Sequence, residues 1–123
     1  HPSGKIAKGN KMEIFQQLDI MPTILDLLNI KTNYYAFGNS YYQEGPREGI
    51  TYLEGIYSYF SAPSMMEFTA GKTKNMYNLD GGFYWTKENM ANDPKQINKM
   101  EKRLKAIIQR YNNDLIKNQT KAK

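Results

Sequence analysis

The chain has 123 residues and a formal net charge of +5, and 40% of its residues are hydrophobic and 13% aromatic. This length supports one domain with one core, and this composition argues against disorder over most of the chain. The chain contains no cysteine, which excludes disulfides and thiolate metal sites, and no apolar run approaches the ~20 residues of a membrane span.

The N-terminal part, up to residue 32, is predicted to be a connector followed by a short apolar helix. Residues 1–15 are rich in loop formers, and because the chain begins at His1 rather than at a methionine, we expect it to continue upstream. In "QQLDIMPTILDLLNI", residues 16–30, Asp19 is a suitable N-cap, Pro22 falls in the first turn, and Asn29 can end the helix in the left-handed conformation. Apolar residues cover most of this helix, so we expect it to lie between other layers rather than on the surface.

The middle of the chain predicts a small antiparallel sheet of about four strands. Residues 33–42, "NYYAFGNSYY", are β-prone and aromatic, and residues 44–49, "EGPREG", form a turn cluster. Two short β-prone runs flank Glu54-Gly55, and a hairpin is predicted with its turn at Gly71-Lys72. Asp80-Gly81-Gly82 is expected to close the last strand, and residues 83–93 are assigned to a loop or short turn. The predicted hairpin strands are residues 65–70 and 73–79.

A long helix is predicted from Asp93-Pro94, with Asp93 as N-cap and Pro94 at the first helical position. Glu101 and Lys105 add a stabilising pair one turn apart. The apolar residues of this segment recur every three or four positions, so they form one stripe that should lie across one face of the sheet. The expected fold class is therefore α+β. The stripe consists of Ile97, Met100, Leu104, Ile107, Ile108, Tyr111 and Leu115.

The residues that carry catalysis in other proteins do not form a recognisable constellation in this sequence. His1 is the only histidine, so zinc clusters are excluded and a Ser-His-Asp arrangement is available only through the first residue. The carboxylates are scattered, without the convergence that a hard-metal site needs. "AGKT", residues 70–73, ends like a phosphate-binding loop, but Met66 stands where the upstream glycine is required, so we interpret it as a hairpin turn. We assign no catalytic, cofactor-binding or metal-binding residue.

The tyrosines and the lysines leave open a binding role for this chain. Tyrosines could form a stacking surface for sugars or bases, but we favour the partly exposed face of a small sheet. Lysines near both ends could meet nucleic acid or anionic headgroups, but without a groove-reading motif we favour a solvated helix face and predict no nucleic-acid partner. Asn118-Gln119-Thr120 also matches a glycosylation triplet. The tyrosines in question are Tyr34, Tyr35, Tyr41, Tyr42, Tyr52, Tyr57 and Tyr59.

The apolar helix segment resembles a motif of sulfatase-like enzymes of the alkaline phosphatase superfamily, nearest the lipoteichoic acid synthase and phosphoglycerol transferase branch. That motif reads Q-x-D-[IL]-x-P-T-[IL]-L-x-L-L-x-I. "YYAFGNSYY", "PSGKIAKG", "NMYNL" and the final helix "KMEKRLKAIIQRYNNDLI" are similar to elements of the same branch, in the same order. An insertion separates "NMYNL" from Asp93-Pro94, which usually follow each other closely there. The match to the motif is carried by Gln17, Asp19, Pro22, Thr23, Leu25, Leu27, Leu28 and Ile30.

The resemblance implies the C-terminal, non-catalytic part of a larger metal-dependent enzyme that acts on sulfate esters or phosphodiesters. Residues 1–32 would belong to the edge of a missing catalytic α/β domain, and residues 33–123 would form the C-terminal subdomain. The parent enzyme would use a divalent metal (Mn, Mg, Ca or Zn) and face the cell envelope or periplasm, with an N-terminal membrane anchor in some relatives. Asp19, Pro22 and Thr23 would be structural, and Tyr34 and Tyr35 could shape the rim of the cleft.

An alternative reading is a stand-alone module that binds anionic glycan or lipid headgroups through tyrosines and lysines. The first reading predicts a sizeable exposed apolar patch around Ile24 and Leu28 and no hydrolase activity of this chain alone. The second predicts a monodisperse monomer whose ligand binding is sensitive to salt. A small basic nucleic-acid binder is the least supported reading.

Overall fold

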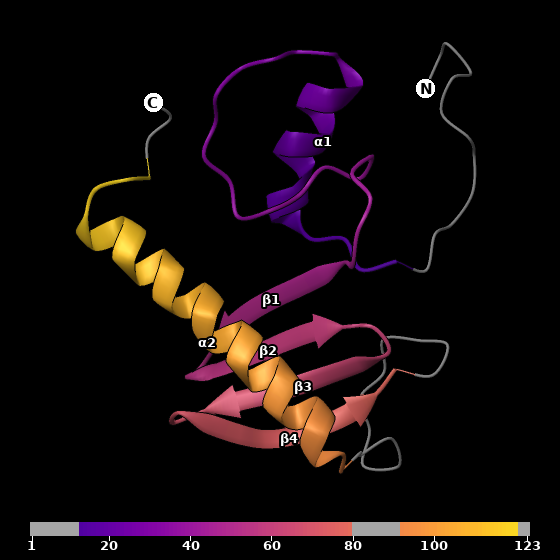
Figure 1. Ribbon diagram of the computed structural model, residues 1–123, viewed down its shortest axis with the longest axis vertical. Helices are drawn as coiled ribbons and strands as arrows, with labels where there is room; N and C mark the ends of the chain where they lie inside the picture. The colour runs from indigo at the N-terminus through magenta and orange to yellow at the C-terminus, as the bar shows by residue number, and fades with distance from the viewer. Residues whose placement is uncertain (1–12, 80–91, 121–123) are drawn as a thin grey trace.

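The computed structural model describes residues 13–79 and 92–120, and its four strands form one antiparallel sheet in the order β1-β2-β3-β4 (Figure 1). Helix α2 lies across one face of this sheet, and α1 stands beyond the β1 edge. The predicted α+β fold, with about four strands, a long C-terminal helix and a short apolar helix before them, is confirmed. The elements are η1 Gln17–Asp19, α1 Ile20–Leu27, β1 Glu48–Leu53, β2 Ile56–Ser61, β3 Ser64–Thr69, β4 Lys72–Asn78 and α2 Pro94–Ile116.

Two tight turns set the register of the sheet. Glu54 and Gly55 have φ values of 50° and 82°, and Ala70 and Gly71 have φ values of 48° and 80°. Positive φ at both central residues matches the two-residue turns whose twist suits a β-hairpin. The turn at Glu54-Gly55 lies where the sequence predicts it. The second turn lies one residue earlier than predicted, so Lys72 begins β4 instead of completing the turn.

The prediction of β structure for residues 33–42 is wrong, because none of these residues belongs to a strand. The backbone amides of Asn39 and Tyr41 donate to side chains of the η1–α1 segment instead of to a neighbouring strand. Local β-propensity is a weak preference that such long-range contacts override. The segment is a loop that is attached to α1.

The hydrophobic core lies between the sheet and α2. Met100 and Leu104 of α2 are 2% and 0% exposed, and Ile97, Ile107 and Ile108 pack against the same cluster, as the predicted stripe requires. Because side chains alternate along each strand, the residues that the sheet supplies to this core lie on one face. That contribution consists of Tyr59, Met66, Phe68 and Met76.

Helix α2 begins as predicted and continues past the β1 edge of the sheet (Figure 1). The Asp93 carboxylate accepts hydrogen bonds from the amides of Lys95 and Gln96, at 2.9 and 3.2 Å, which satisfies two free N–H groups of the first turn. Beyond the sheet, Tyr111 and Leu115 of the stripe remain 48% and 49% exposed.

Several sequence predictions concern residues outside the described ranges. These predictions are the role of His1, the N-terminal connector up to residue 12, the closing turn at Asp80-Gly81-Gly82, and the loop over residues 83–91.

Candidate functional site

Asp19 joins the start of α1 to a loop twenty residues away. The side chain is 3% exposed, and its carboxylate oxygens accept hydrogen bonds from the backbone amides of Gln16, at 3.0 Å, and Asn39, at 2.8 Å. Asp19 occupies the N-cap position of α1, as predicted, but its carboxylate makes no capping bond to that helix. The carboxylate instead closes a capping box around η1 and holds the loop.

Thr23 makes the second attachment between α1 and the same loop. Its hydroxyl donates to the backbone carbonyl of Asp19 at 2.6 Å and accepts from the amide of Tyr41 at 2.9 Å. Pro22 is fully buried. A Cβ at Gly38 would lie 2.1 Å from the carbonyl oxygen of Leu18, so only glycine permits this close approach. Within the segment that carries the resemblance, Asp19, Pro22 and Thr23 therefore have structural roles.

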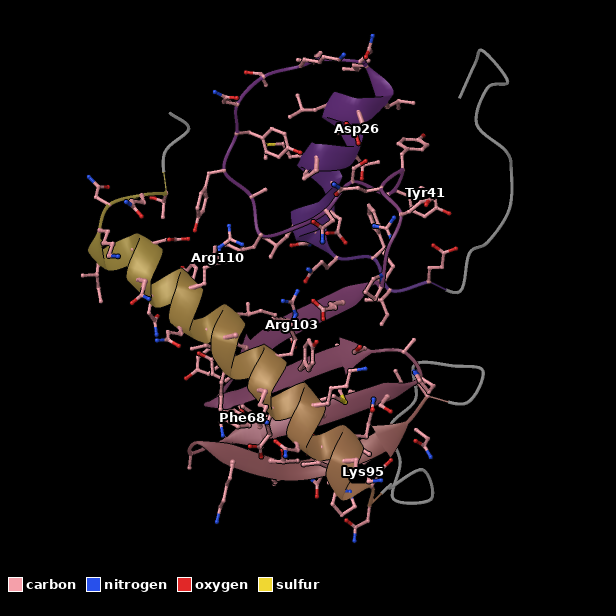
Figure 2. All side chains as sticks on the ribbon, viewed as in Figure 1. Asp26, Tyr41, Phe68, Lys95, Arg103 and Arg110 are labelled. Carbon is pink, nitrogen blue, oxygen red and sulfur yellow. The ribbon has the colours of Figure 1, made fainter. Side chains whose placement is uncertain are left out.

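Helix α1 and the residues directly after it present mostly apolar side chains to solvent, with Asp26 as the charged exception (Figure 2). Pro22 is the only buried residue of this helix. The exposed side chains form what we call the α1 apolar surface, and each is 43% to 61% exposed. A helix that is apolar on most of its circumference ordinarily packs between other elements, so this surface is typical of an interaction site. Its members are Ile20, Met21, Ile24, Leu27, Leu28 and Ile30.

The tyrosines that the sequence groups together are separated by the fold. Tyr52 and Tyr57 pair across β1 and β2 with ring centroids 4.5 Å apart, while Tyr59 is 1% exposed in the core. Tyr35 belongs to the loop and donates its hydroxyl to Asp114 of α2 at 2.9 Å, and Tyr34 is 43% exposed. No single stacking surface contains all of them.

A charged cluster ties β1 to α2 on the core face of the sheet. Arg103 donates to both carboxylate oxygens of Glu48, at 2.8 to 3.1 Å, and the Tyr59 hydroxyl donates to the same carboxylate at 2.7 Å. Burial raises the pKa of Glu48, but the hydrogen bonds from Arg103 and Tyr59 and the Arg103 charge outweigh it, so the pKa is lowered overall. Burial and the Glu48 contact raise the pKa of Tyr59, which keeps its hydroxyl a donor. The cluster is fully paired and holds the helix on the sheet.

The "AGKT" segment forms a hairpin turn and the start of β4, as interpreted from the sequence. The backbone amide and the hydroxyl of Thr73 both donate to the Glu101 carboxylate of α2, at 2.8 and 2.7 Å. Lys105 donates to the other oxygen of Glu101 at 2.8 Å, which confirms the predicted pair. The Lys105 and Thr73 side chains lower the pKa of Glu101 to about 2. Thr73 therefore attaches β4 to α2 rather than binding phosphate.

A groove of about 740 Å³ lies against the loop before β1. Tyr41, Tyr42 and Glu44 line it together with Arg47, which the sequence analysis did not single out. Arg47 donates to the backbone carbonyls of Ser40, Tyr41 and Gln43, and its guanidinium lies 5.2 Å from the Tyr41 ring centroid. It makes no ion pair with any described residue. Arg47 lies within the predicted turn cluster, residues 44–49, and this position carries no signal of its role.

No group of three or more histidine, cysteine or acidic side chains in residues 13–79 and 92–120 is placed to hold a metal ion. The described helices are also too short or too polar to cross a membrane. Comparison of the chain with protein-family models, with curated proteins and with solved structures gives no match.

Proposed function

We propose that this chain is the C-terminal, non-catalytic subdomain of a metal-dependent enzyme of the sulfatase or phosphoglycerol transferase type. In this proposal, the enzyme acts on sulfate esters or phosphodiesters, and the α1 apolar surface docks on its catalytic α/β domain. The observation that carries the proposal is the exposure of that surface on a helix whose N-cap Asp19 and whose Thr23 already accept hydrogen bonds from the amides of Asn39 and Tyr41.

Two features of α1 support a fixed docking element. Asp19 and Thr23 attach it to the loop by accepting hydrogen bonds of 2.8 and 2.9 Å from the amides of Asn39 and Tyr41, so its orientation relative to the loop is set before any partner binds. The exposed side chains are leucine, isoleucine and methionine, which gain most from burial against another apolar face. The same segment carries the resemblance to the sulfatase-like motif, in which this helix would border the catalytic part.

The divalent metal of such an enzyme does not fit the described residues of this chain. Those residues provide no convergent set of metal ligands. The nucleophile and the metal ligands of the proposed enzyme would therefore come from upstream, and no chemical step is assigned to this chain.

The size of the native polypeptide tests the proposal directly. An immunoblot of the cells that make the protein, with antibody raised to this chain, should show a band several times larger than 14.3 kDa. The isolated chain should hydrolyse neither sulfate esters nor phosphodiesters with Mn²⁺, Mg²⁺, Ca²⁺ or Zn²⁺. A native band near 14 kDa, or metal-dependent hydrolysis by the chain alone, would overturn it.

A pair of variants tests the docking surface itself. Ile24→Ser with Leu28→Ser should reduce both the binding of a hydrophobic dye and the self-association of the isolated chain, because it removes two of the six side chains of the α1 apolar surface. Leu53→Ser at the hairpin tip removes a side chain that is 72% exposed, and should leave both properties nearly unchanged. Equal effects of the two changes would show that α1 is not a distinct surface.

The groove beside Arg47 favours a second candidate, a module that binds anionic glycan or lipid headgroups. Tyr41 and Tyr42 line the groove beside a guanidinium that has no carboxylate partner among the described residues. This candidate predicts a monodisperse monomer that binds a sulfated oligosaccharide in a salt-sensitive manner. Tyr42→Ala, at a side chain 52% exposed, should weaken that binding at least several-fold while leaving the fold unchanged.

A further inference from the structure

Helix α2 presents a face to solvent that carries lysines and no carboxylates. We call it the α2 outer face; all of its members are exposed, and they lie opposite the stripe that packs on the sheet. Their spacing of three or four residues, with one adjacent pair at the end, keeps them on one side of the helix. The face consists of Lys95, Lys99, Lys102, Ala106, Gln109, Asn113, Ile116 and Lys117.

The acidic residues of α2 form ion pairs with cations outside the α2 outer face, so they leave the lysines of that face without a carboxylate partner on the helix. Glu101 pairs with Lys105 at 2.8 Å, and Asp114 lies 3.6 Å from Arg110. Arg103 pairs with Glu48 of β1. The lysines of the α2 outer face make no ion pair with any residue that the structure describes, so the face carries uncompensated positive charge in its first three turns, at Lys95, Lys99 and Lys102, and again at Lys117.

The helix dipole does not explain the lysines in the first three turns, although it favours a cation at Lys117. Lys95 lies in the first turn, where a cation opposes the positive end of the dipole, and Lys99 and Lys102 lie beyond the reach of that effect. The first turn contains no acidic residue. The lysines also make no contribution to the core, because all of them are exposed and none packs against the core cluster. Their arrangement is therefore better explained by an external anionic partner.

The form of the α2 outer face favours a bilayer over a nucleic acid. The face follows one helix for about 33 Å from Lys95 to Lys117, and it includes no aromatic side chain on which a base could stack. At its far end, Ile116 is 83% exposed beside Lys117. A row of lysines with an exposed apolar side chain suits the boundary between headgroups and acyl chains.

We propose that the α2 outer face is a peripheral binding surface for an anionic phospholipid bilayer. Lys95, Lys99 and Lys102 face the phosphate headgroups, and Ile116 enters the headgroup boundary. This inference does not rest on the proposed docking of α1, and none of the residues that line the groove beside Arg47 belongs to α2.

Vesicle co-sedimentation tests this proposal with the full 123-residue chain. All measurements use the Ile24→Ser, Leu28→Ser background, so that α1 contributes less apolar binding. The chain should bind vesicles that contain phosphatidylglycerol at physiological salt, should not bind vesicles of phosphatidylcholine alone, and should be released at high salt. Undiminished binding to phosphatidylcholine vesicles would overturn the proposal.

Two triple variants test whether vesicle binding depends on the position of the lysines or only on the net charge of the chain. Lys95→Gln, Lys99→Gln, Lys102→Gln should lower the vesicle partition coefficient on the order of 100-fold, about fivefold for each lysine. Glutamine is a good helix former, so helicity by circular dichroism should be unchanged. The matched control carries three exposed lysines outside α2 changed to glutamine, has the same net charge, and should retain most of the binding. These control positions are Lys31, Lys72 and Lys74.

The outcomes decide between the bilayer and other anions. Equal losses in the two triple variants would attribute binding to net charge and overturn the proposal. Tighter binding to a single-stranded RNA than to phosphatidylglycerol vesicles, lost in the α2 variant alone, would reassign the face to nucleic acid. Ile116→Ser should further lower the partition coefficient several-fold, and no change would remove the apolar contact from the proposal.

Discussion

Asp19→Asn tests whether one carboxylate holds the loop on α1. The aspartate accepts two backbone amides with two different oxygens, from Gln16 and Asn39, and is almost fully buried. Asparagine offers one carbonyl oxygen and one NH₂ group, so one of the two amides loses its acceptor and meets a donor. An unsatisfied buried amide costs about 1–3 kcal/mol, and loss of the charge weakens the remaining bond by about 1 kcal/mol, for about 2–4 kcal/mol in total.

Native-state hydrogen exchange is the assay that locates this effect. Protection of whichever amide loses its acceptor, Asn39 or Gln16, should fall about 30-fold or more, which corresponds to the lower end of that range, and the other amide should lose protection to a smaller extent. Urea denaturation should show a lower midpoint, because the free energy of unfolding falls. If α1 and its loop unfold before the sheet, this fall cannot exceed the free energy of opening that part of the chain.

Asp26→Asn is the matched control on the same helix. Asp26 is exposed and its side chain makes no hydrogen bond or ion pair with a described residue, so the change should stay within about 0.5 kcal/mol. The reasoning fails if both variants lose the same stability, or if the exchange of the Asn39 and Gln16 amides is unchanged by Asp19→Asn.

Three further predictions concern the contact between α2 and the sheet. Leu104→Ala, at a fully buried side chain, should cost about 2–5 kcal/mol in thermal or urea unfolding, whereas Leu115→Ala, half exposed, should cost less than about 1 kcal/mol. The pKa of Glu101 is lowered to about 2 from an ordinary 4.5, so its contribution is present above pH 4.5 and is lost as the pH falls toward 2. Glu101→Gln should therefore cost about 1–2 kcal/mol at pH 6 and remove part of this acid sensitivity, and an unchanged pH profile would refute the assignment. A double-mutant cycle on Glu48 and Arg103 should give a coupling of about 1 kcal/mol, because the arginine side chain is 57% exposed and solvent screens the pair.

Two of the residues that carry the resemblance also attach α1 to the loop that follows it. The sequence motif marks Asp19, Pro22 and Thr23, and the structure shows that Asp19 and Thr23 attach α1 to its loop and that Pro22 is buried. The exposure of Ile24 and Leu28 that the first reading predicts is present, at 48% and 61%. The catalytic partner remains the proposal that the native size of the polypeptide tests.

The sequence by itself determined the elements whose signals are local. Helix α2 follows from the Asp93-Pro94 cap and an apolar stripe that repeats within the helix, and β1 and β2 follow from β-prone runs on either side of Glu54-Gly55. The end of α1 at Asn29, with φ of 52°, is equally local. In each case, the residues that decide the conformation lie within a few positions of one another.

Only the tertiary structure decided the roles that depend on distant partners. Residues 33–42 are β-prone but form a loop, because Asp19 and Thr23 take their amides out of any strand ladder. Glu48 and Arg103 are 55 positions apart, and no spacing rule could pair them. The physical reason is that a buried amide or carboxylate must find a partner wherever the fold supplies one, and propensity and periodicity describe only the neighbours along the chain.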